Sequence, residues 1–127
     1  YARAGHEIPL IIDQKGNLTQ PEYKKGAALC LFDDPPVDVN TVFIPPGSTL
    51  LMYTDGATDA MNDTGKLFGF DNLKQTILNS LNSPVQELCE QIIKDLVFFQ
   101  KNTQFDDITI VALRNLKNAL IHLYFEI

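Results

Sequence analysis

Apolar residues in the first half of the chain follow the patterns that are typical of β-strands. Residues 8–12 are apolar and β-branched, and turn-forming residues follow at 13–17, so the pattern predicts a strand and a turn. Residues 17–26 predict a return strand at an edge, because Pro21 has no N–H to donate. Residues 49–54 form a nearly continuous apolar run, which predicts a strand buried on both faces.

The middle of the chain changes to the three- and four-residue spacing of amphipathic helices. Residues 70–81 show this spacing and predict a first helix. Ser83 is predicted to cap a second helix, with Pro84 at its first position and Gln86 completing a capping box. The apolar stripe of this second helix is predicted to pack on the sheet, and it consists of Val85, Leu88, Cys89, Ile92, Leu96 and Phe99.

The end of the chain predicts one more strand and an apolar tail. Residues 108–113 are apolar and β-branched, so they predict the last strand of the domain. The tail, residues 115–127, fits a helix by the spacing of its leucines and a strand equally well. It could fold back over this chain's own sheet. We expect instead that the isolated fragment forms a homodimer or higher oligomer through strand edges or the tail.

Composition limits the class of protein. The chain has 127 residues, 45% of them hydrophobic and 20% charged, which is typical of one globular domain. Its formal net charge of −6 argues against a nucleic-acid partner, which would require a basic patch. No apolar run reaches the length of a membrane span, so we expect no membrane contact. Cys30 and Cys89 lack the spacing of a metal or redox motif, which favours buried thiols in a reducing cytoplasm.

Acidic residues stand beside two of the predicted strands. Asp55 and Gly56 follow the strand at 49–54, and Asp59 lies four residues after Asp55. Asp106 and Asp107 directly precede the last strand. Asp55 and Asp106 would meet if these two strands were antiparallel neighbours, and carboxylate oxygens are ligands that hard divalent cations prefer. Taken alone, these residues fit an Asp-Gly turn and a solvated loop better than a metal site.

The order of the motifs carries more information than each motif alone. The segments RAGHEIPLII, IPPGSTLLMYTDGATDA, KLFGFDNL and FDDITIVALR occur in that order, with the capped helix before the last. This order resembles the C-terminal half of the stage II sporulation protein E family, metal-dependent serine/threonine phosphatases related to the type 2C phosphatases. The resemblance covers residues 1–114 and leaves 115–127 as a tail. It implies an α+β fold, part of an αββα-type β-sandwich with flanking helices, whose N-terminal half we expect to be missing.

The resemblance also implies a metal site and a reaction. Complete domains of the family hold two Mn²⁺ or Mg²⁺ ions, which activate a water that attacks phosphoserine or phosphothreonine. Asp55 and Asp106 match family positions that bind metal. Asp107 and Asp59 are secondary candidates, and Gly56 matches the glycine that permits the sharp turn. The aspartate that bridges both metals in the family has no counterpart here, so we expect the 127 residues alone to be inactive.

The resemblance implies a substrate and a setting as well. Family members dephosphorylate regulatory proteins, such as phosphorylated anti-sigma-factor antagonists, in the cytoplasm and as C-terminal domains of larger sensor proteins. An alternative is a non-catalytic interaction module that retains the phosphatase-like fold, and a third is an unrelated α+β domain with coincidental acids. His6 is interpreted as a structural residue that holds a turn, and His122 as a surface or interface residue.

Overall fold

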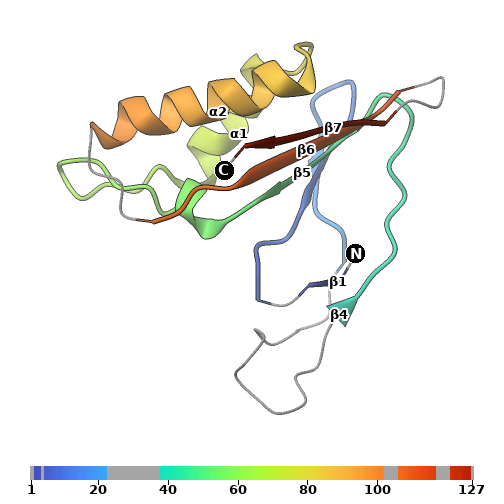
Figure 1. Ribbon diagram of the computed structural model, residues 1–127, viewed down its shortest axis with the longest axis horizontal. Helices are drawn as coiled ribbons and strands as arrows, with labels where there is room; N and C mark the ends of the chain where they lie inside the picture. Colours follow the sequence, from blue (N-terminus) through green and yellow to red (C-terminus); the bar gives the residue numbers. More distant parts are fainter. Residues whose placement is uncertain (1, 4, 23–37, 102–105, 117–120, 127) are drawn as a thin grey trace.

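A five-stranded antiparallel sheet organises the chain (Figure 1). The computed structural model describes residues 2–3, 5–22, 38–101, 106–116 and 121–126. In spatial order the sheet contains β3 (Leu18–Thr19), β2 (Leu10–Ile12), β5 (Thr49–Tyr53), β6 (Ile110–Asn115) and β7 (Ile121–Glu126). A separate two-stranded ribbon pairs β1 (Ala2–Arg3) with β4 (Asp38–Val39).

The strands form where the apolar pattern predicted them. β5 is buried at four of its five positions, which confirms a strand with little solvent contact on either face. The turn before β3 is built on Asp13, whose carboxylate accepts hydrogen bonds from the backbone N–H groups of Lys15 and Asn17 at 2.8 and 2.9 Å. The predicted return strand is short: β3 spans two residues, and residues 23–26 lie outside the described part of the chain.

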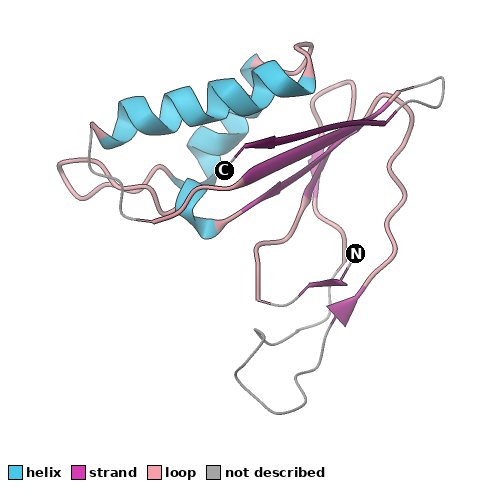
Figure 2. Cartoon of the chain, viewed as in Figure 1, coloured by secondary structure: helices cyan, strands magenta, loops and turns pink. Residues whose placement is uncertain are grey.

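Two helices cover one face of the sheet, in agreement with the helical spacing of the sequence (Figure 2). They are α1 (Gly69–Asn79) and α2 (Val85–Gln100). The predicted capping box of α2 is wrong. Pro84 occupies the cap position with an extended ψ of 150°, so Ser83 lies one residue too early to bond the first turn. The Gln86 side chain instead donates a hydrogen bond to the Glu90 carboxylate at 2.9 Å.

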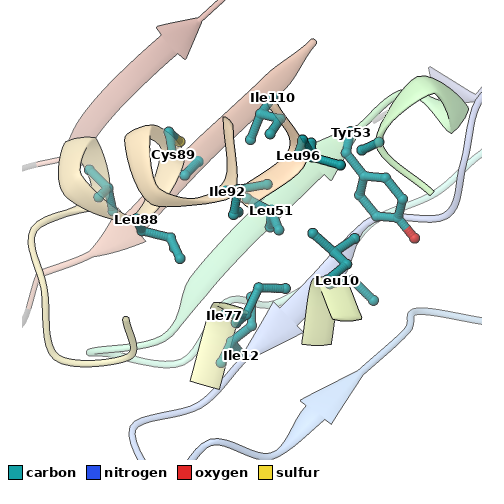
Figure 3. Close-up of a cluster of buried hydrophobic side chains, with 14 of the residues drawn as sticks. Leu10, Ile12, Leu51, Tyr53, Ile77, Leu88, Cys89, Ile92, Leu96 and Ile110 are labelled. Atoms are coloured by element: carbon teal, nitrogen blue, oxygen red, sulfur yellow. The ribbon is translucent and has the colours of Figure 1, made fainter. Parts of the chain in front are cut away.

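The core lies between α2 and the central strands (Figure 3). Leu88, Ile92 and Leu96 from α2 are almost fully buried, as are Leu51 of β5 and Ile110 of β6. Burial of one such aliphatic side chain stabilises the fold by roughly 1.5–3 kcal/mol. The predicted stripe of α2 is therefore confirmed, with Cys89 inside the core, whereas Cys30 lies outside the described residues.

Polar contacts fix the two helices to each other and to the sheet. The Thr76 hydroxyl of α1 donates to the Asp95 carboxylate of α2 at 2.6 Å. Arg114, at the end of β6, donates to the Thr49 hydroxyl at 2.9 Å and to the Ser83 carbonyl at 2.6 Å. Burial lowers the pKa of Arg114. These bonds hold the connection between the helices against the sheet end where β5 begins.

The C-terminal residues extend this chain's own sheet. β7 pairs antiparallel with β6 from Ile110↔Glu126 to Asn115↔Ile121, with His122 opposite Arg114. The sequence left open whether the tail forms a helix or a strand. The structure shows a strand that folds back beside β6. Association of the 127-residue chain with further copies stays a prediction. No helix in the described ranges has the length and apolar character that crossing a membrane requires.

Candidate metal centre

The pairing of β5 with β6 brings the two predicted aspartate-bearing loops to the same end of the sheet. Tyr53 at the end of β5 is opposite Ile110 at the start of β6. One residue further out, the Thr54 N–H donates to the Thr109 carbonyl at 3.1 Å. The two strands are thus antiparallel neighbours, as the metal hypothesis required. Asp55 and Asp106 lie on the loops that leave and enter this end.

Asp55 begins a single turn of 3₁₀-helix, η1 (Asp55–Ala57), and is exposed. Its backbone carbonyl accepts hydrogen bonds from the N–H groups of Thr58 and Asp59 at 2.9 and 2.7 Å. The Thr58 hydroxyl also donates to this carbonyl, at 3.1 Å. The backbone of the turn is therefore held by local bonds, while the Asp55 side chain stands at the protein surface, where an ion can reach it.

Gly56 lies against the second loop. It is buried, and a Cβ atom built on it would lie 2.4 Å from the carbonyl oxygen of Asp107 and 3.6 Å from the Cβ atom of Asp106. Its φ lies outside the left-handed region, so conformational freedom is not the reason for a glycine here. Gly56 is required because the backbone of the 106–107 segment occupies the space of a side chain.

The other candidate acids belong to the same two loops. Asp106 and Asp107 are both exposed, and the Asp107 N–H donates to the Asp106 carboxylate at 2.8 Å. Asp59 is exposed two residues after η1, and its N–H donates to the Asp55 carbonyl. His6 is exposed in the segment before β2. The four aspartates therefore occupy two loops that touch through Gly56.

Thr54 links the two loops directly, although its sequence context did not single it out. Its hydroxyl donates to the Asp107 carbonyl at 3.0 Å and accepts from the Thr109 N–H at 3.0 Å. The sequence does show that Thr54 stands between a predicted buried strand and the Asp55-Gly56 pair. Its partners, however, are more than fifty positions away, so no local pattern could identify them.

Glu7 was also missed. Burial raises the pKa of Tyr53, and the negative charge of Glu7 raises it further, so Glu7 lies near this end of the sheet. The signal was present: Glu7 directly precedes the predicted strand at 8–12, and β2 is the other antiparallel neighbour of β5. Glu7 thus brings a negative charge to the neighbourhood of Tyr53, at the end of β5.

The donor atoms fit a hard divalent cation, but only as part of a ligand set. Exposed carboxylates on two adjoining loops are the type of ligand that Mg²⁺ and Mn²⁺ prefer. Within the ranges that the structure describes, however, no three His, Cys, Asp or Glu side chains gather closely enough to hold an ion. The described residues of the two loops thus offer part of a ligand set for such an ion.

Comparisons with known proteins identify the family of the chain. The family model for stage II sporulation protein E (SpoIIE) matches residues 1–115. Protein IcfG from a Synechocystis species is 31% identical over 114 residues, which cover 89% of this chain and 18% of that protein. Phosphoserine phosphatase RsbU from Bacillus subtilis is 29% identical over 114 residues, which cover 90% of this chain and 34% of that protein.

A solved structure supports the same assignment. The SiaA-PP2C domain of Pseudomonas aeruginosa superposes with a TM-score of 0.64 and 26% sequence identity, over 89% of this chain and 45% of that one. The fold is thus PP2C-like, with the predicted α+β class. The chain spans less than half the length of each of these relatives. A family match over residues 1–115 shows that this chain belongs to the stage II sporulation protein E (SpoIIE) family.

Proposed function

We propose that this chain is part of a metal-dependent protein serine/threonine phosphatase. The observation that carries the proposal is the contact between the loop of Asp55 and the loop of Asp106 at one end of the β5–β6 pair. Membership of the SpoIIE family and the similarity to phosphoserine phosphatase RsbU support it. The substrate in this proposal is a phosphoserine or phosphothreonine on a regulatory protein, such as an anti-sigma-factor antagonist, in the cytoplasm.

The roles of the residues follow from their positions. Asp55 and Asp106 would bind Mn²⁺ or Mg²⁺ with their carboxylates, and Asp107 and Asp59 are secondary candidates on the same loops. Such ions, when bound, activate a water as the nucleophile and neutralise the charge of the phosphoryl oxygens. Gly56 contributes by letting the two loops touch. The complete domain would hold two ions, and the described residues would supply only part of their ligands.

Phosphate release from a serine-phosphorylated protein tests this proposal in the full-length protein. We expect hydrolysis that depends on Mn²⁺ and stops when the metal is chelated. Asp55→Asn keeps the size of the side chain but removes its charge. The rate should therefore fall by more than about 100-fold, a larger loss than is typical for a residue that only orients a metal ligand. Asp71→Asn, an exposed change in the first turn of α1, is the matched control and should keep the wild-type rate.

A second candidate function is a protein-interaction module that keeps the fold without catalysis. Because the described residues supply only part of a ligand set, this alternative is tested beside the first proposal. In that case the full-length protein would bind a regulatory partner but release no phosphate with Mn²⁺ or Mg²⁺. Equal rates for wild type and Asp55→Asn would likewise contradict the phosphatase proposal.

A further inference from the structure

We propose that Thr54 is a positioning residue that sets the separation of the two aspartate-bearing loops, an inference that rests on the proposed function. Its hydroxyl group links the loops because it donates one hydrogen bond and accepts another. The hydroxyl donates to the Asp107 carbonyl at 3.0 Å and accepts from the Thr109 N–H at 3.0 Å. The Thr54 backbone N–H adds a third bond, to the Thr109 carbonyl at 3.1 Å.

These hydrogen bonds lie at the point where the β5–β6 ladder ends and the two loops begin. Tyr53↔Ile110 is the last residue pair of the β5–β6 ladder, and the chain diverges into the two loops beyond it. Thr54 extends the pairing by one residue, directly before Asp55. The separation of the loops is therefore fixed at the point where each begins to carry its acids.

The same carbonyl is held from two sides. The Asp107 oxygen accepts the Thr54 hydroxyl and lies against Gly56, where a Cβ atom would come within 2.4 Å. The Asp107 N–H in turn donates to the Asp106 carboxylate at 2.8 Å. A continuous path of contacts thus runs from Thr54 through the backbone of Asp107 to the carboxylate of Asp106.

The hydroxyl group, rather than the shape of the side chain, is the part that this role requires. Valine has nearly the shape of threonine but can neither donate to the Asp107 carbonyl nor accept from the Thr109 N–H. Serine retains both capacities. Loss of a group that orients metal ligands typically costs 10–100-fold in metal affinity. The conservative pair Thr54→Val and Thr54→Ser therefore separates the hydroxyl from the volume that it occupies.

Thr49 provides a matched control at the other end of the same strand. Its hydroxyl accepts a hydrogen bond from Arg114 at 2.9 Å, far from both aspartate-bearing loops. Thr49→Val should lower the stability of the fold while leaving the metal site intact. The control thus distinguishes a general loss of stability from a change at the candidate metal centre.

The experiment measures the Kd for Mn²⁺ by isothermal titration calorimetry in the full-length protein, with thermal unfolding of each metal-free variant in parallel. Thr54→Val should weaken Mn²⁺ binding by about 10–100-fold. Thr54→Ser and Thr49→Val should stay within about threefold of wild type, well below that loss. If Thr54→Val does not fold, Thr54→Ala replaces it, because the smaller side chain removes the hydroxyl without placing a methyl group beside the Asp107 carbonyl.

Two results would overturn the inference: wild-type Mn²⁺ affinity in the variants that lack the Thr54 hydroxyl, or an equal loss of affinity in Thr49→Val. The Asp55→Asn variant keeps this outcome distinct from failure of the proposed function. Weakened binding in Asp55→Asn with normal binding in Thr54→Val rejects only the role of Thr54. Normal binding in Asp55→Asn rejects the proposed metal site itself.

Discussion

Gly56 and Asp107 meet across the two aspartate-bearing loops with no room for a side chain between them. A Cβ atom on Gly56 would lie 2.4 Å from the Asp107 carbonyl oxygen, which is backbone and cannot swing aside. Any substitution at Gly56 must therefore push the two loops apart. The same contact couples the stability of the fold to the geometry of the candidate metal centre.

The first prediction concerns this contact. Gly56→Ala should destabilise the fold by about 1–3 kcal/mol, the usual cost of overpacking, and should also weaken Mn²⁺ binding in the full-length protein. Gly65→Ala is the comparison, because Gly65 faces open space and carries only the strain of its φ of +79°. It should lower stability and leave Mn²⁺ affinity unchanged. Denaturant unfolding and calorimetry measure the two effects, and equal Mn²⁺ affinity in both variants would contradict the steric account.

The second prediction concerns the stripe of α2 on the sheet. Leu88→Ala and Ile92→Ala each empty a buried aliphatic site, so each should cost about 2–5 kcal/mol in the free energy of unfolding. Val97→Ala on the same helix is the control, since Val97 is 57% exposed and should change stability by less than about 1 kcal/mol. Thermal melts that do not differ between Leu88→Ala and Val97→Ala would place this face of α2 in solvent.

The third prediction concerns pH and the ion pair between Asp63 and Lys101. The Lys101 ammonium group lies 2.7 Å from the Asp63 carboxylate and lowers the pKa of Asp63 below its ordinary value of 3.8. A lowered folded-state pKa means that the pair stabilises the fold above pH 3.8 and that this contribution disappears as the pH falls through the lower value.

The comparison of wild type with Asp63→Asn measures this contribution. Both groups are exposed, so the difference in melting temperature should be small at neutral pH and should shrink further in high salt. It should vanish at a pH below the folded-state pKa. A difference that grows as the solution is acidified would have the wrong sign for an ion pair.

The fourth prediction concerns assembly of the 127-residue chain. β3 and β7 are the outer strands of the sheet within the described residues, and open strand edges pair readily with other chains. We expect a dimer or higher oligomer in sedimentation equilibrium over a wide range of concentration. Because β7 folds back beside β6, the tail is already paired on one side. A single 14.2 kDa species at every concentration would contradict association and leave the fold-back strand as the whole role of the tail.

Much of the fold followed from the sequence because its signals were local. The continuous apolar run at 49–54 identified β5, and the three- and four-residue spacing identified α1 and α2. The cap of α2 was mispredicted because Ser83-Pro84 can begin a helix in two ways, with serine at the N-cap and proline at the first helical position, or with proline at the N-cap. Pro84 occupies the N-cap here, with an extended backbone. The form of the tail was left open because its apolar residues fit both periods, and pairing with β6 decided it.

Of the candidate site, too, the sequence predicted the local features and not the contacts between distant residues. The positions of Asp55 and Asp106 beside strands could be read from the chain, and the family resemblance gave them a role. The bridge made by Thr54 and the packing of Gly56 depend on residues more than fifty positions away. These contacts exist only once β5 and β6 pair, so no local pattern could have predicted them.

Binding of Mn²⁺ to the full-length protein tests most directly whether Asp55 and Asp106 form one metal centre. Calorimetry should compare wild type with Asp55→Asn, Asp106→Asn and the exposed control Asp71→Asn. If the two aspartates bind the metal, Asp55→Asn and Asp106→Asn should each lose at least about tenfold in Mn²⁺ affinity, while Asp71→Asn binds as wild type does. Wild-type Mn²⁺ affinity in both Asp55→Asn and Asp106→Asn would contradict it.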